Sequence, residues 1–286
     1  MSAVAEESDN QGGKMPLLDH LIELRQRLLY SVLGLIAAFL VCFYFAEPIF
    51  YYLAKPLEDI LKSTVDRPRM IFTALTEVFF TYVKVAFFAG AFISCPIFLT
   101  QLWLFVAPGL YKTEKKAFAP FLIASPILFF MGGALVYYVI FPLAANFLVV
   151  VVPPPSGETS LPIELEAKVS EYLSLMMKLI FAFGLCFQLP VIMTLLARVG
   201  LATSKGMAAK RKYAIVGVFI VAAVFTPPDP VSQLMLAIPI IVLYEISIYM
   251  AKIVERNRPK DEYDDDDDGD EDEDEDEDES GEVKPA

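Results

Sequence analysis

Two carboxylates at the edges of apolar segments are the residues of this sequence best suited to binding a ligand. Glu23 stands in the segment 20–27, four residues before Arg27, and Glu114 follows a Pro-Gly turn at 108–109. Carboxylates pair well with the planar fork of a guanidinium, so the two acids together could hold an arginine-bearing ligand. A structural role is the alternative. Glu23 and Arg27 have the i, i+4 spacing of a solvated helix pair, and the helix dipole favours an acid in a first helical turn.

A second group of polar residues lies within or beside the apolar segments, where a charge or an amide is costly to bury. Amides in lipid need hydrogen-bonding partners, so we expect Gln188 and Gln233 to contact another helix. Lys84 and Lys178 have long stems that let the ammonium reach the membrane surface. Glu245 could be neutral, paired or exposed to water. The whole group consists of Glu77, Lys84, Lys178, Gln188, Asp229, Gln233 and Glu245.

Common catalytic chemistries have no motif in this sequence. It contains no P-loop, no glycine-rich nucleotide fingerprint, no HExxH and no GxSxG. His20 is the single histidine, and Cys42, Cys95 and Cys186 each lie in an apolar run without metal-type spacing. We therefore predict that the protein is not an enzyme, holds no metal or cofactor, and does not bind nucleic acid.

Transmembrane helices are the elements predicted to position these residues. Hydrophobic residues make up 56% of the 286 residues, and the mean hydropathy is +0.53. A helix needs roughly 20 apolar residues to cross the hydrocarbon core, and six segments are suitable, which predicts an all-α integral membrane protein. The fourth segment is interrupted by Lys178 and by the region of Gly184 and Pro190. The predicted spans are residues 28–46, 78–99, 117–141, 172–197, 213–226 and 231–250.

These spans divide the chain into three parts. Residues 1–27 are predicted to form an amino-terminal segment with an amphipathic lead-in helix, and residues 28–256 a six-span membrane domain. Residues 257–286 are dominated by Asp and Glu, a composition that predicts a disordered, solvating tail. The outer loops, about 47–77 and 142–171, contain enough apolar residues for short cap helices.

Lysine and arginine are distributed unequally between the two sides of the predicted membrane domain. Sixteen lie on the side of both termini and five on the other, so the positive-inside rule places both termini in the cytoplasm. The last two spans and their turn share the 39 residues between Lys212 and Lys252. This leaves roughly 17 or 18 residues for each helix, about 26 Å. We expect both to be barely long enough, so that the outer turn is drawn into the bilayer or the bilayer is thinned there.

Several stretches spread over residues 16–255 match one family in order and spacing. They are HLIELRQR (20–27), the run 101–105, APGLYKTE (107–114) with Lys116, YYVIFP (137–142), FAFGLCFQLP (181–190) and FTPPDPVSQLMLAIP (225–239). Together they resemble TatC, the polytopic subunit of the twin-arginine protein translocase. The resemblance covers the whole membrane body. It implies a cup-shaped six-helix fold with short periplasmic cap helices, located in the bacterial inner (cytoplasmic) membrane.

The resemblance also implies a function in Sec-independent protein export. Members of this family recognise the twin-arginine motif in the signal peptides of folded precursor proteins, and export is driven by the transmembrane proton gradient. The recognition surface lies on the cytoplasmic amino-terminal segment and the first cytoplasmic loop. By motif position, Glu23 and Glu114 would face the arginine pair, and Arg25 and Phe105 would shape the site.

Partner contacts are implied along the later helices. The matching positions for single-span TatA- and TatB-type subunits are Gln188, Thr226, Asp229 and Gln233, in a complex that would contain further copies of this chain and membrane lipid. Gln188 departs from the family, because many members have a glutamate at this position. A glutamine can exchange hydrogen bonds with a partner helix but carries no charge, so a mechanism that needs an ionised acid there would not apply.

Two other functions are open from the residue types. A proton-coupled small-solute transporter could use Glu77, Lys84, Lys178 and Glu245, but it would need carboxylates deep in facing helices and an internal repeat, and neither is evident. An intramembrane enzyme would need a histidine, a Ser–His pair or an Asp pair within the spans, and the predicted spans contain none. A paired acidic site beside a Pro-Gly turn suits an arginine-motif receptor and has no use in a transporter.

Overall fold

The computed structural model describes residues 17–64, 69–106, 115–151, 167–225 and 230–256, and these residues are almost entirely helical. Glu114, Thr226, Asp229 and the tail 257–286 lie outside the described residues. The helices are α1 (Leu17–Tyr44), α2 (Ala46–Thr64), α3 (Leu75–Val106), α4 (Lys115–Leu135), α5 (Phe141–Val151), α6 (Val169–Cys186), α7 (Leu189–Val199), α8 (Ser204–Ala209), α9 (Arg211–Phe225) and α10 (Pro230–Arg256). A π-helical turn, η3 (Val136–Ile140), joins α4 to α5, and β1 (Met70–Ile71) and β2 (Ala167–Lys168) are two short strands.

Five helical segments of the described chain are long and apolar enough to cross a membrane, which agrees with the predicted all-α membrane fold. They are His20–Tyr44, Leu75–Phe105, Pro120–Phe147, Val169–Val199 and Gln233–Arg256. The remaining predicted span corresponds to α9, which has 15 residues, about 22 Å of helix. Of the two last helices expected to be short, only α9 is short. Helix α10 has 27 residues and continues past Lys252, because a lysine ends an apolar run but is itself a good helix former.

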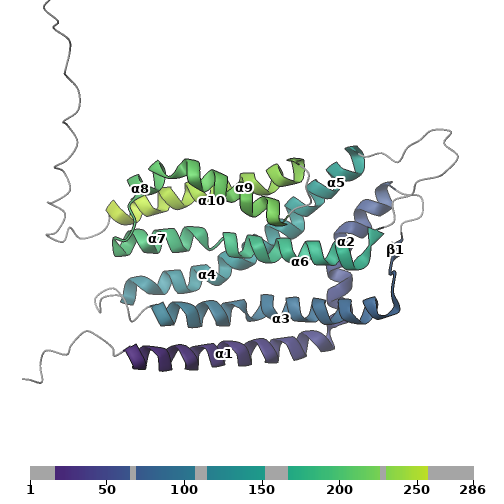
Figure 1. Ribbon diagram of the computed structural model, residues 1–286, viewed down its shortest axis with the longest axis horizontal. Helices are drawn as coiled ribbons and strands as arrows, with labels where there is room; N and C mark the ends of the chain where they lie inside the picture. Colours follow the sequence, from purple (N-terminus) through teal and green to yellow (C-terminus); the bar gives the residue numbers. More distant parts are fainter. Residues whose placement is uncertain (1–16, 65–68, 107–114, 152–166, 226–229, 257–286) are drawn as a thin grey trace, which may run out of the picture.

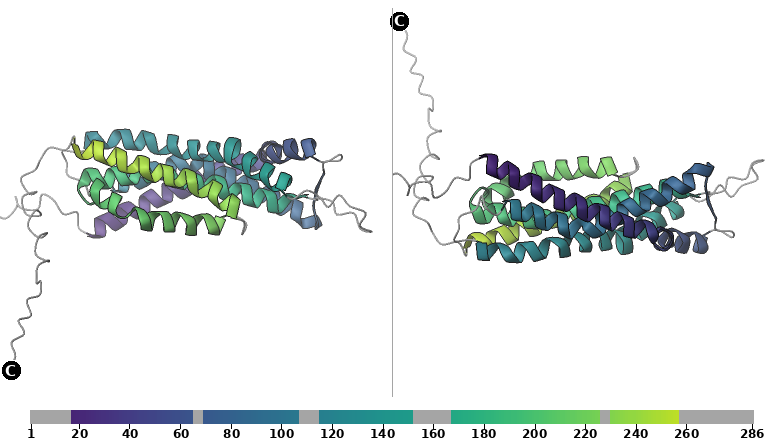
Figure 2. Two further views of the ribbon diagram at one scale, coloured as in Figure 1. Left: turned by 90° about the horizontal axis from the view of Figure 1, so that it is seen from above. Right: turned by 90° about the horizontal axis from the view of Figure 1, so that it is seen from below.

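The long helices lie side by side in Figure 1, with α1 at one edge and α9 and α10 at the other, and α2 crosses their direction at one end. Figure 2 shows the same common direction from above and below. Helix α6 is central: Leu173, Met176 and Phe183 are almost completely buried in the main apolar core. Helix α1 packs mainly on α3, and of its described side chains only Ser31 and Cys42 are buried. A lipid-facing edge helix is expected to expose most of its apolar side chains.

The predicted break in the fourth span is present, at the junction of α6 and α7. The amide of Phe187 donates to the carbonyl of Phe183 at 2.9 Å and that of Gln188 to Leu185 at 2.9 Å, after which α7 begins at Leu189. Pro190 lacks an N–H and its ring excludes a straight continuation of the helix. The third predicted span differs, because helical structure runs through η3 into α5 instead of ending near residue 141. The π-helical turn, which ends two residues before Pro142, lets the helix continue through this proline.

The outer loops were expected to form short cap helices, and α2 and α5 lie in them. The structure adds a feature that was not predicted: β1 pairs with β2 in parallel, with Met70 opposite Ala167 and Ile71 opposite Lys168. This pair connects the first outer loop to the second. It consists of two residues per strand, too few for a recognisable alternating pattern in the sequence.

Helix α2 is fastened to the bundle through tyrosines. Pro56 has no N–H, so the carbonyl of Tyr52 one turn earlier has no helical donor. The hydroxyl of Tyr137 donates to that carbonyl at 2.7 Å, and the rings of Tyr52 and Tyr137 stack with centroids 4.7 Å apart. Tyr172 donates to the carbonyl of Leu53 at 2.8 Å. The pKa of Tyr52 is raised mainly by its hydrogen bond with Tyr138 and, to a smaller extent, by burial.

Candidate functional site

Close packing of α1 against α3 sets the geometry at the amino-terminal end of the bundle. A Cβ atom on Gly90 would come within 2.8 Å of the backbone of Phe39, so a side chain at residue 90 would separate the two helices. Further along, Gly34 faces Ile97. Small residues let membrane helices approach in this way. The antiparallel register defined by these contacts brings residues 20–27 of α1 opposite residues 101–105 of α3.

Glu23 and Arg27 form the predicted i, i+4 pair at this end. Nε of Arg27 donates to Oε1 of Glu23 at 2.8 Å, and Nη2 donates to the same oxygen. The side chains of Glu23 and Arg27 are 23% and 22% exposed, so the pair is partly shielded from solvent. Nη1 of Arg27 also donates to Oε1 of Gln101 on α3 at 3.4 Å. The pair therefore belongs to an interhelical cluster and is more than a solvated surface contact.

An aromatic pair lies next to this cluster. The imidazole of His20 stacks on the ring of Phe105 with centroids 4.2 Å apart and an interplanar angle of 14°. Nδ1 of His20 is 4.0 Å from Oε2 of Glu23, the carboxylate oxygen that Arg27 leaves free. Among the described residues, no hydrogen bond to Oε2 is present. The free oxygen thus lies beside a stacked pair of rings.

The predicted recognition residues are brought together only in part. Glu23 and Phe105 share one site at the start of α1 and the end of α3. Arg25 is exposed and, two residues from Glu23, points to roughly the opposite side of α1, since each residue turns an α-helix by about 100°. Glu114 lies outside the described residues, so its distance from Glu23 stays a prediction.

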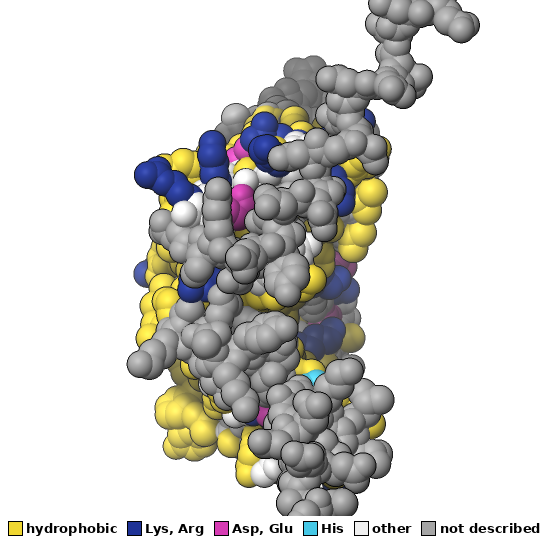
Figure 3. Space-filling model, turned by 90° about the vertical axis from the view of Figure 1, so that its left-hand side faces the viewer, with side chains coloured by type: hydrophobic (Ala, Val, Ile, Leu, Met, Phe, Trp, Pro, Cys, Tyr) yellow, Lys and Arg dark blue, Asp and Glu magenta, His cyan; other side chains and the backbone are white. Residues whose placement is uncertain are grey.

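The same end of the molecule is rich in basic residues. Figure 3 looks onto this end and shows lysine and arginine side chains gathered over its upper half, where α8, α9 and α10 lie. Helix α10 holds this region by two polar contacts: Glu255 accepts from the amide and hydroxyl of Ser204, and Tyr244 donates to the carbonyl of Met207 at 2.8 Å. The exposed basic residues there are Lys205, Lys210, Arg211, Lys212, Lys252 and Arg256.

The two predicted amide residues each contact a neighbouring helix of this chain. Nε2 of Gln188 donates to the carbonyl of Ser125 on α4 at 2.9 Å, and Gln188 is 4% exposed. Its Oε1 has no hydrogen-bond partner among the described residues. Nε2 of Gln233 donates to the carbonyl of Phe219 on α9 at 3.1 Å. Thr226 and Asp229 lie outside the described residues, so contacts of these four positions with a partner subunit stay a prediction.

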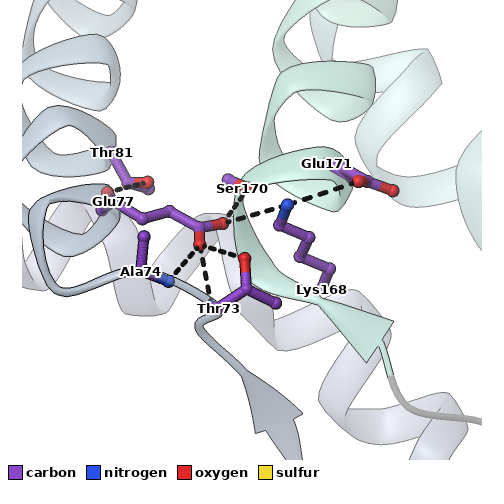
Figure 4. A network of polar contacts seen from close by, with 7 residues as sticks. All are labelled: Thr73, Ala74, Glu77, Thr81, Lys168, Ser170 and Glu171. Atoms are coloured by element: carbon purple, nitrogen blue, oxygen red, sulfur yellow. Dashed lines mark hydrogen bonds and ion pairs between the residues drawn. The ribbon is translucent and has the colours of Figure 1, made fainter.

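Glu77 forms a second carboxylate cluster (Figure 4), in the first turn of α3 and so at the opposite end of the bundle. Oε2 accepts from the amide of Thr73 at 2.8 Å, its hydroxyl at 2.9 Å and the amide of Ala74 at 3.2 Å. Oε1 accepts from the hydroxyl of Ser170 and lies 3.9 Å from Nζ of Lys168. The carboxylate therefore caps the start of α3 and joins it to the start of α6, beside the β1–β2 pair.

The residues of the alternative transporter do not converge. Glu77 is occupied by the cap just described, and Lys84 and Lys178 are exposed on the outside of the bundle. Glu245 is exposed and paired with Arg211, whose Nη2 is 2.9 Å from Oε2 of Glu245. The described residues contain no group of three or more His, Cys, Asp or Glu side chains that could hold a metal ion.

Sequence reasoning missed three contacts: the hydrogen bond from Arg27 to Gln101, the stacking of His20 on Phe105, and the capping by Glu77. The first two connect residues more than 70 positions apart, and their signal is the presence of Gly34 and Gly90 on facing helices. Glycines in membrane helices indicate that another helix approaches closely, but which helix it is and in what register can be read only from the structure. For Glu77, its place three residues after Ala74 at a helix start was an available local signal.

Comparisons with known proteins agree with one another. The family model described as Sec-independent protein translocase protein (TatC) matches residues 19–239. The TatC protein of Magnetococcus marinus is 50% identical over 249 residues, which is 87% of this chain and 88% of that protein. The TatC protein of Escherichia coli (strain K12) is 38% identical over 248 residues, 86% of this chain and 92% of that protein.

A solved structure is also similar. The crystal structure of a twin-arginine translocase receptor, TatC, superposes with a TM-score of 0.70 at 36% identity, covering 82% of this chain and 99% of that chain. Sequence and fold thus agree over nearly the whole membrane body. The chain belongs to the TatC family of Sec-independent protein translocase proteins.

Proposed function

We propose that this chain is the receptor subunit of a twin-arginine translocase and binds the paired arginines of signal peptides on folded precursors. The observation that carries the proposal is the partly shielded Glu23 carboxylate, which already binds the guanidinium of Arg27 and has its second oxygen beside the His20–Phe105 rings. A guanidinium can pair with a carboxylate and stack on an aromatic face at the same time, whereas an ammonium is a compact point charge.

One arginine of the motif is proposed to bind at Glu23 and Phe105, and the second at Glu114 in the loop after α3. Arg25, exposed on another side of α1, would contact the peptide beyond the arginine pair or anionic groups near it. Two separate carboxylates fit a motif with two adjacent arginines, because each acid can then accept hydrogen bonds from one guanidinium. No enzymatic step is involved in this recognition.

The recognition site is proposed to face the cytoplasm. The positive-inside distribution supports a location in the bacterial inner membrane with both termini in the cytoplasm. In this orientation the Glu77 cluster and the cap of α2 and α5 lie on the periplasmic side. Helix α9, with 15 residues, would span the bilayer only where the hydrocarbon layer is thin or its outer turn is drawn inward.

Single-span TatA- and TatB-type subunits are proposed as partners, with further copies of this chain in the complex. The surface for them would be the later helices, around Gln188, Thr226, Asp229 and Gln233. Oε1 of Gln188 has no hydrogen-bond partner among the described residues but is buried, so a donor from a partner helix would reach it only after a local rearrangement. The proton gradient is the proposed source of energy for export.

Peptide binding tests the proposed receptor function. Full-length protein in nanodiscs is titrated with a fluorescent twin-arginine signal peptide, and the measurement is repeated with Glu23→Ala and Glu114→Ala. A partly desolvated charged hydrogen bond contributes about 1.5–3 kcal/mol, so each variant is expected to lose roughly ten- to a hundredfold in affinity. A peptide with lysines in place of the arginines should bind equally weakly.

The matched control is Glu58→Ala. Glu58 is also a helical glutamate with an i, i+4 basic partner, Lys62, but it lies on α2 at the other end of the bundle. Its replacement should leave peptide affinity unchanged. The proposed site would be rejected if Glu23→Ala, Glu114→Ala and the lysine peptide all gave the wild-type affinity.

A further inference from the structure

Arg27 occupies the carboxylate to which the peptide would bind. Both hydrogen bonds from its guanidinium to Glu23 end on Oε1, and the pair is about four-fifths shielded from solvent. Gln101 on α3 accepts a further hydrogen bond from the same guanidinium. The packing of α1 on α3 therefore holds an arginine of the chain itself in the position of a ligand.

This arrangement changes the electrostatics of the site. A free carboxylate attracts any cation, but a carboxylate already paired with a guanidinium has little net charge left to attract a second one. An incoming cation must either displace Arg27 or share the carboxylate through Oε2. Two arginines can share one carboxylate, because it has two oxygens and can accept several hydrogen bonds.

We propose that Arg27 competes with the peptide for the Glu23 carboxylate. A cationic peptide therefore binds only when its own contacts outweigh this competition. This inference rests on the proposed receptor function and adds to it the residue that makes recognition stringent. The pairing of Arg27 with Glu23 suppresses the attraction that lysine and arginine share. Stacking on the His20–Phe105 rings beside Oε2 remains available, and it favours a flat guanidinium over an ammonium.

The test is the variant Arg27→Gln, titrated with a twin-arginine peptide and a twin-lysine peptide in nanodiscs. Removing a partly exposed competitor should raise the affinity for the twin-arginine peptide about two- to fivefold. The twin-lysine peptide should gain at least as much, so that the preference for arginine decreases. In a Glu23→Ala background, Arg27→Gln should give no gain, because the competition acts through Glu23.

Arg211→Gln is the matched control, because it removes the other described arginine–glutamate pair at the same end, Arg211 with Glu245. It should leave both peptide affinities unchanged. Gln101→Ala tests the proposal independently of any folding defect at Arg27, since both charges stay in place. It removes the hydrogen bond that holds Arg27 to α3, so Arg27 is displaced more easily. Peptide affinity should therefore also rise, by less than in Arg27→Gln.

A lower or unchanged twin-arginine affinity in Arg27→Gln, with the fold intact, would overturn the competitor role. A decrease would instead identify Arg27 as a residue that positions Glu23. These outcomes differ from a failure of the receptor function itself, in which the wild type would bind the twin-arginine and twin-lysine peptides alike and Glu23→Ala would have no effect.

Discussion

Glu23 and Glu77 are both partly shielded glutamates at helix ends, but their environments are opposite. Glu77 accepts hydrogen bonds on both oxygens, from Thr73, Ala74 and Ser170. Glu23 has a single hydrogen-bonding partner among the described residues, Arg27, and both hydrogen bonds from it end on one oxygen. A carboxylate whose oxygens are both occupied by its own chain stabilises the fold, whereas one with a free oxygen is available to a ligand.

Helix α3 connects these two sites. It begins at the Glu77 cap and ends near Gln101 and Phe105, so one rigid element carries the structural carboxylate at one end and part of the candidate binding site at the other. This predicts that stability and recognition can be separated by mutation at the two ends of α3, and that they are lost together when α3 itself is displaced.

Glu77→Ala should give the largest loss of stability among the variants considered for this comparison. It removes the acceptor for two backbone amides and two hydroxyls and disconnects the start of α3 from the start of α6. Thermal unfolding in detergent and hydrogen exchange of residues 69–77 measure the effect. Twin-arginine peptide affinity should stay at the wild-type value, and a combined loss of binding would contradict the separation of the two ends.

Gly90→Leu should affect both properties, because a Cβ atom at residue 90 meets the backbone of Phe39 at 2.8 Å and neither helix can yield without moving. Overpacking of this kind destabilises a protein by about 3 kcal/mol. The displaced α1 would also separate Arg27 from Gln101 and His20 from Phe105. Unfolding and peptide titration should both change; intact binding would show that the α1–α3 register does not position the site.

Local sequence patterns predicted local structure well. The i, i+4 spacing of Glu23 and Arg27 gave the correct ion pair, since helix geometry alone brings such residues together. Helix-breaking residues near Gly184 and Pro190 predicted the break between α6 and α7. The family resemblance, which combined several such stretches, is confirmed by the family model and by the similar structures.

Contacts between helices could not be predicted in the same way. Gln101 is polar on an otherwise apolar helix, but nothing in its neighbourhood indicates that its partner is Arg27, 74 positions earlier. The β1–β2 pair and the Ser170–Glu77 contact depend on how two outer loops meet. Such contacts depend on how helices and loops far apart in the sequence pack together. The 3.6-residue periodicity of a single helix does not predict which residues of another helix it meets.

Tyr137→Phe should weaken the outer end by less than Glu77→Ala and leave recognition unchanged. It removes the hydroxyl that donates to the Tyr52 carbonyl in place of a helical amide, because Pro56 has no N–H. A partly buried carbonyl that loses its hydrogen bond costs about 1–2 kcal/mol of unfolding free energy. Pro56→Ala in the same protein should restore much of the loss by supplying the missing amide, and an absence of rescue would locate the effect of Tyr137 in ring stacking instead.

Arg211→Gln should have the smallest effect, and it sharpens the comparison at the end of the bundle that carries the candidate site. Arg211 and Glu245 are about half exposed, with side chains 50% and 46% accessible, and an exposed ion pair contributes about 0.2–1 kcal/mol. The loss should shrink further in high salt, because solvent ions screen exposed charges. Thermal unfolding at low and high salt measures it. A loss as large as that of Tyr137→Phe, independent of salt, would mean that this pair fixes α9 against α10 and that exposure alone does not separate structural from available carboxylates in this protein.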